Sequence, residues 1–153
     1  EIDIADDGWR AIDNIEQIIT TASSAAASAL DGDIGERQLS LRLASNDEVQ
    51  ALNKQFRGQD KATNVLSFGM EDDGLDWPPD EPRPLGDVIL AFGVVQKEAA
   101  DFGKKIESHL THLVVHGVLH LAGYDHEDAE TANDMEALEI QILAGLGIEN
   151  PYD

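Results

Sequence analysis

One predicted helix constrains this chain more than any other segment. Residues 110–121 are strongly apolar, yet they include His116 and His120. Because the two histidines are four positions apart, a helix projects both imidazole rings from the same face, one turn apart. Gly123 can end such a helix with a positive φ angle, and the turn that follows can bring His126 to the same point. The spacing therefore predicts a buried helix that presents two histidines beside a third.

Three neutral imidazoles that converge on one point suit a single Zn²⁺ ion. Structural zinc sites usually have four protein ligands, often cysteines, whereas catalytic sites keep one position open for water or substrate. This chain has no cysteine. The residues therefore favour an open, catalytic zinc site with His116, His120 and His126 as its ligands.

Two further histidines, His109 and His112, leave an alternative ligand set. His112 lies one turn before His116 and could replace His126 as the third ligand. Three ligands on one straight helix diverge, however, because each residue advances by about 100° around the axis. We therefore expect His112 to support the helix or another ligand, without binding the metal itself.

A zinc ion in such a site lowers the pKa of water to about 7 and polarises a carbonyl or phosphoryl oxygen. Zinc peptidases with the pattern His-Glu-x-x-His carry a general base between their ligands. Here position 117 is glycine, which counts against that kind of protease, although Asp125 or another carboxylate could in principle serve as the base. Arg57 is the candidate for stabilising the developing anion, because arginine makes bidentate contacts with phosphate oxygens. The alternative is that Arg57 pairs with one of the 31 Asp and Glu residues.

The formal net charge of −21 would repel nucleic acid at long range. Six of the ten basic residues fall in two short segments, which allows either a local basic groove or scattered, solvated lysines. These six are Lys54, Arg57, Lys61, Lys97, Lys104 and Lys105. No stretch approaches the ~20 consecutive apolar residues of a membrane span, so no membrane association is expected.

Hydrophobic periodicity predicts the order of the elements. Alternating or short apolar runs predict strands over 1–5, 38–44, 65–68 and 87–92, the last of them central. Helical spacing predicts helices over 9–30, 47–56, 94–105, 110–121 and 128–143. A turn at 31–33 is expected to end the first helix, and the run Ser45-Asn46-Asp47-Glu48 supplies N-cap chemistry for the second. Residues 71–84 hold six acidic residues and four prolines and are expected to form a long loop. The pattern predicts one α+β domain over residues 1–153, a mixed sheet of about four strands layered with about five helices, with the metal site on a helix–glycine turn.

The run His116-Gly-x-Leu-His120-Leu-x-Gly-Tyr-Asp-His126 resembles the signature of the YbeY family, bacterial zinc-dependent endoribonucleases of ribosomal RNA maturation. The likeness extends along most of the chain, because four further segments are similar to other blocks of that family: 52–68 (with Phe56-Arg57), 85–90, 135–143 and 146–152. The departures are mild. Ala62, Asn64 and Gly69 stand where the family commonly has Pro, Asp and Pro.

The resemblance implies that His116, His120 and His126 hold one zinc ion and that Arg57 is the functional arginine near the metal. His116 would then serve in catalysis as well as in metal binding. The implied substrate is single-stranded RNA, in processing of the 3′ end of small-subunit rRNA and in ribosome quality control, with the cytoplasm as the site of action. The implied partners are the ribosome, a small-subunit protein and an rRNA-associated GTPase.

The hypothesis is therefore a metal-dependent, single-strand-specific endoribonuclease. One alternative is a zinc peptidase, since the ligand helix has the geometry of one. The other is a non-catalytic ribosome-assembly factor whose zinc is structural. The negative charge fits the assembly factor somewhat better, because weak intrinsic affinity for RNA would require a protein partner to deliver the substrate.

Overall fold

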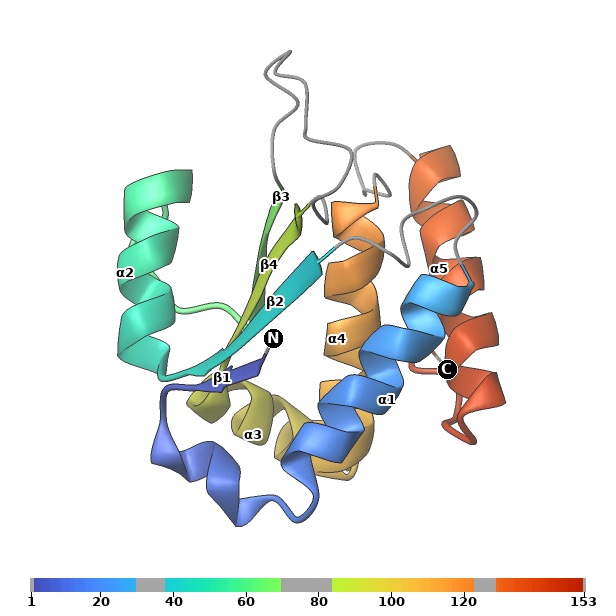
Figure 1. Ribbon diagram of the computed structural model, residues 1–153, viewed down its shortest axis with the longest axis horizontal. Helices are drawn as coiled ribbons and strands as arrows, with labels where there is room; N and C mark the ends of the chain where they lie inside the picture. The colour runs from blue at the N-terminus through green and yellow to red at the C-terminus, as the bar shows by residue number, and fades with distance from the viewer. Residues whose placement is uncertain (1, 30–37, 70–83, 123–128, 153) are drawn as a thin grey trace.

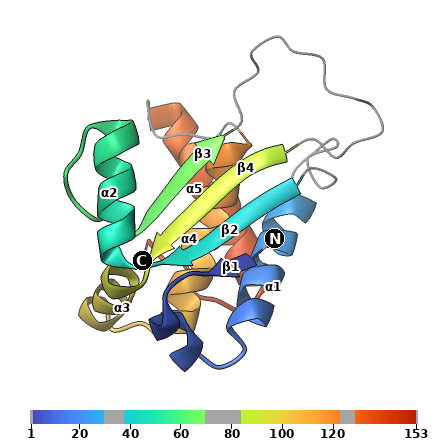
Figure 2. The same ribbon diagram turned by 60° about the vertical axis from the view of Figure 1, so that its left-hand side comes forward.

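The computed structural model describes residues 2–29, 38–69, 84–122 and 129–152. Alternating apolar residues form four strands, which are β1 (Ile2–Ile4), β2 (Gln38–Ala44), β3 (Val65–Gly69) and β4 (Pro84–Ala91). They make one mixed sheet in the order β1-β2-β4-β3, seen face-on in Figure 2. β1, β2 and β4 are parallel, and β3 runs antiparallel to β4 at the edge. The predicted central position of the segment around 87–92 is confirmed.

Five α-helices and one short 3-10 helix cover this sheet within the described residues. They are η1 (Asp7–Ala11), α1 (Ile15–Ser28), α2 (Asn46–Arg57), α3 (Phe92–Asp101), α4 (Ile106–Leu121) and α5 (Ala129–Gly145). Figure 1 shows α2 on one face of the sheet and α1, α4 and α5 on the other. The predicted α+β domain, with its four-stranded mixed sheet and five helices, is thus confirmed. None of the described helices is long and apolar enough to cross a membrane.

The two faces of the sheet build two apolar cores, because successive residues of a strand point to opposite sides. Val88 and Leu90 of β4 lie in the larger core, against the helices of the α4 side. Ile89 and Ala91 lie in a smaller core beneath α2, together with Val49. The side chains of β3 also point alternately to the two faces of the sheet. This edge strand therefore lies between the α2 side of the molecule and the α4 side.

α4 is the central helix of the larger layer. Nine of its 16 residues are buried, and it packs against α1, α3, α5, β3 and β4. Its closest approach to the sheet is at Gly117, where an added Cβ would lie 2.9 Å from Cγ1 of Val88 and 3.2 Å from Oγ of Ser67. This buried helix therefore gives the histidines a fixed position relative to β3 and β4.

The structure corrects some predicted boundaries. The helix expected over 9–30 is two helices, η1 and α1, because Asn14 has a φ of 58° and interrupts the α-helical backbone. Asparagine is among the few residues that adopt this left-handed conformation readily. Phe92 begins α3, although it was expected to end a strand, and Lys104 and Lys105 lie beyond the end of α3. The expected turn at 31–33 and residues 71–83 of the expected loop lie outside the described residues.

The predicted start of α2 is confirmed in detail. Ser45 is its N-cap, and the Ser45 hydroxyl accepts a hydrogen bond of 3.2 Å from the backbone N–H of Glu48. Such a cap satisfies one of the free N–H groups at a helix start. α2 ends at Gly58, whose φ of 70° is the left-handed conformation that favours glycine. These two signals fix the position of Phe56 and Arg57 in the last turn of the helix.

Candidate metal centre

His116 and His120 lie one turn apart near the end of α4, as their spacing predicts. Their ring centroids are 4.7 Å apart, and their ring planes are at 77° to each other. Both side chains are partly exposed, although the helix around them is buried. Gly123 and His126 lie outside the described residues. The structure thus brings together two of the three histidines predicted as ligands.

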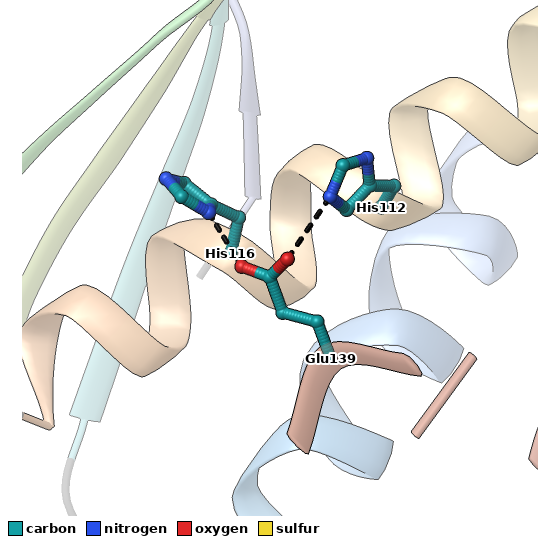
Figure 3. A group of neighbouring side chains, drawn as sticks. All are labelled: His112, His116 and Glu139. Atoms are coloured by element: carbon teal, nitrogen blue, oxygen red, sulfur yellow. Dashed lines mark hydrogen bonds and ion pairs between the residues drawn. The ribbon is translucent and has the colours of Figure 1, made fainter. Parts of the chain in front are cut away.

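A buried glutamate from the neighbouring helix holds the first of these rings. Glu139 of α5 has no exposed surface, and its Oε1 is 2.5 Å from Nδ1 of His116. Its other oxygen, Oε2, is 3.2 Å from Nε2 of His112 and accepts a hydrogen bond from the hydroxyl of Tyr152. Figure 3 shows the carboxylate between the two histidines of α4.

The charge of this carboxylate decides which atoms donate. Burial raises the pKa of Glu139, but hydrogen bonds from His112, His116 and Tyr152 outweigh it and lower the pKa to about 2. Burial and the neighbouring carboxylate raise the pKa of Tyr152, so its hydroxyl keeps its proton. An ionised carboxylate only accepts hydrogen bonds, so His116 donates through Nδ1 and His112 through Nε2. The nitrogen of His116 that does not face this carboxylate is Nε2.

The described residues also allow a second metal-binding arrangement. Ligand atoms of His112, His116 and Glu139 lie within 4.8 Å of one another and could hold an ion. This group shares only His116 with the predicted set. An ion among these atoms would replace the hydrogen bonds that they now make to each other. The same contacts fit the role predicted for His112, which would support another residue through the shared carboxylate.

Arg57 lies at the edge of the sheet, close to the turn of α4 that carries His116. Its Nη2 donates a hydrogen bond of 2.8 Å to the backbone carbonyl of Ser67 on β3. The hydroxyl of Ser67 donates in turn, at 3.3 Å, to the carbonyl of Gly117 on α4. Within the part of the chain that the structure describes, Arg57 makes no ion pair with a carboxylate. The alternative, in which Arg57 only pairs with an acidic neighbour, therefore has no support among these residues.

Packing of α4 on the sheet explains why position 117 is glycine. An added Cβ would lie only 2.9 Å from Val88, so α4 packs on β4 at this point without room for any side chain. A glutamate between the two histidines, as in the peptidase pattern, would have to displace the helix from the sheet. The packing thus argues against a peptidase that uses a base at this position.

Sequence reasoning assigned no role to Glu139 or Tyr152. The signal was present for Glu139, because it lies on the apolar stripe of α5 between Met135 and Leu143, both fully buried. A charged residue in such a stripe requires a partner inside the protein. Nothing in the sequence identified that partner as the histidines of α4.

Two of the six basic side chains in the predicted basic segments lie beside carboxylates, and a third contacts a backbone carbonyl. Lys97 forms a 2.7 Å ion pair with Asp101, and Lys54 lies 3.8 Å from Asp60. The Lys104 ammonium donates to the carbonyl of Pro151. These contacts favour solvated or locally paired lysines over a basic groove.

The fold and the site together define an α+β protein with a candidate metal centre on its central helix. The family model for "Endoribonuclease YbeY" matches residues 3–147, and the chain belongs to this family. The Endoribonuclease YbeY of Rhodopseudomonas palustris strain HaA2 is 47% identical over 156 residues, covering 99% of this chain and 80% of the relative. That of Nitrobacter winogradskyi is 46% identical over 153 residues with the same coverage. The solution structure of TM1509 from Thermotoga maritima has a TM-score of 0.59 at 26% identity, covering 96% of this chain and 92% of the other.

Proposed function

We propose that this protein is a metal-dependent endoribonuclease that cuts single-stranded RNA, in processing of the 3′ end of small-subunit rRNA and in ribosome quality control. The observation that carries the proposal is the orientation of His116. Its Nδ1 is held by the buried Glu139, and its ring lies beside that of His120, with centroids 4.7 Å apart. Membership of the YbeY family supports the class of reaction.

In this proposal His116, His120 and His126 hold one Zn²⁺ ion. Imidazole nitrogens suit zinc, and a carboxylate that accepts a hydrogen bond from the second nitrogen of a ligating histidine fixes the ring and increases its basicity. The donor set therefore fits the metal. When bound, zinc supplies Lewis-acid chemistry at a phosphoryl oxygen and lowers the pKa of water to about 7.

Arg57 is proposed to neutralise the charge that develops on the phosphoryl group. Its contact with Ser67 fixes the guanidinium with one N–H donor, and the remaining donors of this exposed side chain can reach a phosphate. The hydrogen bonds from Arg57 to Ser67 and from Ser67 to Gly117 support this role, because they connect the arginine to the turn of α4 that carries His116. His116, which lies on this turn of α4, is proposed to serve in catalysis as well as in metal binding.

The proposal includes the biological setting that family membership suggests. The substrate is rRNA, and the partners are the ribosome, a small-subunit ribosomal protein and an rRNA-associated GTPase. The proposed location is the cytoplasm. A net charge of −21 supports a role for such partners, because they can deliver RNA that the protein attracts poorly on its own.

The test is cleavage of end-labelled single-stranded rRNA fragments by the zinc-loaded protein, with and without chelator. We expect Arg57→Ala to lower the rate on the order of 10²–10³-fold, by analogy with the removal of other single electrostatic donors. Arg10→Ala is the matched control, because Arg10 is also exposed and pairs only with Asp7 in the described structure. A 2′,3′-cyclic phosphate on the product would identify the RNA 2′-OH as the nucleophile, and a 3′-hydroxyl would identify water.

Three outcomes would contradict the proposal. Equal cleavage by the wild type, Arg57→Ala and His120→Ala proteins in chelator would indicate a contaminating nuclease. Full activity of Arg57→Ala alone would remove this arginine from the mechanism. Absence of cleavage even with ribosomal particles, together with a defect of ribosome assembly in a His120→Ala strain, would favour the assembly factor.

A further inference from the structure

Phe56 is one of few large apolar side chains that the described structure leaves exposed. It lies in the last turn of α2, directly before Arg57, and 59% of its surface is exposed. Its ring makes an edge-to-face contact with Phe68 of β3, with centroids 5.5 Å apart and planes at 64°. Phe68 is itself packed on the small core beneath α2. An exposed ring is thus held in place by a partly buried one.

Arg57 completes this surface. Its guanidinium carbon lies 5.2 Å from the centroid of the Phe68 ring, within the range of a cation–π contact. The three side chains of Phe56, Arg57 and Phe68 therefore form one continuous patch, which we call the Phe56 platform. The patch combines aromatic surface with a positive charge that no described carboxylate neutralises.

The platform lies across the edge strand from the candidate metal centre. Ser67 of β3 bonds to α4 through its hydroxyl, whereas the next residue, Phe68, packs on the α2 side of the sheet. β3 is the edge strand of the sheet formed by the described residues. A strand of RNA that reaches His116 from the α2 side would pass Phe56 and then Arg57.

The charge of the protein decides what kind of contact can hold that strand. Most RNA-binding surfaces gain affinity from many lysines and arginines. This chain has a net charge of −21, and Lys54 and Lys97 lie beside acidic neighbours. Stacking of a base on an aromatic ring needs no net positive charge and is available only to unpaired bases. An exposed phenylalanine beside the proposed catalytic arginine supplies this contact.

We propose that Phe56 stacks on an unpaired base of the RNA substrate and holds the single strand beside Arg57 where it crosses the edge of β3. This inference rests on the proposed function, since it names the contact that selects single-stranded RNA for the same site. It predicts that binding depends on the aromatic character of residue 56, and that apolar bulk alone does not suffice.

The experiment measures binding of the zinc-loaded protein to a short single-stranded 2′-O-methyl oligoadenylate that contains one 2-aminopurine, with its integrity checked by electrophoresis. Stacking is worth enough per base that we expect Phe56→Ala and Phe56→Leu to raise Kd about 5- to 150-fold and to abolish quenching of 2-aminopurine fluorescence. Phe56→Trp should retain both. Phe102→Ala is the matched control, because Phe102 is also 59% exposed and also contacts an aromatic ring and a basic side chain.

The variants separate stacking from a structural role. If Phe56→Leu binds and quenches as the wild type does, the ring only covers apolar surface and the inference is wrong. It is equally wrong if Phe102→Ala weakens binding as much as Phe56→Ala, or if the wild-type protein does not bind the probe. Failure of the proposed function looks different, because the wild type would then bind the probe with Phe56 dependence and still cut no RNA. Circular dichroism of each variant shows that it is folded.

Discussion

Replacement of Glu139 by glutamine would test whether this carboxylate orients the ring of His116. The carboxylate accepts hydrogen bonds on both oxygens, from His116 on Oε1 and from His112 and Tyr152 on Oε2. Glutamine has nearly the same shape, but one end of its amide is a donor. Whichever end the NH₂ group occupies, it faces at least one donor of the protein, so the variant loses charge and one or two of these bonds.

The expected size of the effect follows from the position of the residue. Loss of a carboxylate that supports a histidine ligand lowers metal affinity about 10- to 100-fold, which corresponds to about 1.4–2.7 kcal/mol. Hydrogen bonds to a buried charge are worth about 1.5–3 kcal/mol each, although the variant also avoids the cost of burying that charge. We therefore expect Glu139→Gln to bind zinc 10- to 100-fold more weakly and to lower the free energy of unfolding by about 1–3 kcal/mol.

Competition with a chromophoric chelator at neutral pH measures the affinity, and urea denaturation of the metal-free protein measures the stability. His120→Ala and His112→Ala provide the comparison. If the predicted ligands are correct, His120→Ala loses far more affinity than Glu139→Gln, and His112→Ala loses no more than Glu139→Gln. The reverse order, with His112 and Glu139 essential and His120 dispensable, would refute our interpretation and establish the group His112, His116 and Glu139 as the metal site. Unchanged affinity in Glu139→Gln would show that the carboxylate does not orient His116.

Two further predictions concern α4 and the metal. Gly117→Ala should lower the free energy of unfolding by about 1–3 kcal/mol in urea, because its Cβ would lie 2.9 Å from Val88. Gly145→Ala, at the end of α5 with nothing within 4 Å of its Cβ, is the control and should be neutral or stabilising by up to about 1 kcal/mol; equal stability of Gly117→Ala and wild type would show that α4 can move away from the sheet. Chelation should abolish RNA cleavage while helical circular dichroism and cooperative unfolding persist, because packing of the apolar core holds α4. Loss of helical signal on chelation would identify the zinc as structural.

Local patterns predicted most of the fold because the elements are strongly periodic. The alternation of β2 and the cap at Ser45 correspond directly to backbone geometry, and the structure confirms both. The break before α1 could not be predicted in this way. Ile12 is buried although it lies outside α1, so the apolar spacing continues through the interruption at Asn14.

The site was only partly predictable, for a related reason. The four-residue spacing of His116 and His120 is a local property of one helix, and it fixed their relative position. The contact of His116 with Glu139 joins two helices across 23 positions of the sequence. No local pattern specifies such a pairing. The sequence pattern also identified the missing base at Gly117, but the reason for the glycine is its packing against β4.

The distribution of burial along α4 favours a catalytic role over a structural one for the proposed zinc ion. A structural zinc provides the folding free energy of a small domain, and its ligands are generally enclosed. Here the folding of α4 has another source, because nine of its residues are buried in an extensive apolar core. Glu139 likewise accepts hydrogen bonds from protein side chains, so it does not need a metal ion to balance its buried charge. His116 and His120 stay partly exposed near the end of this helix, which is linked through Ser67 of the edge strand β3 to Arg57 of α2. A metal held there contributes little that the fold needs, and it is accessible to a substrate, which is the arrangement that catalysis requires.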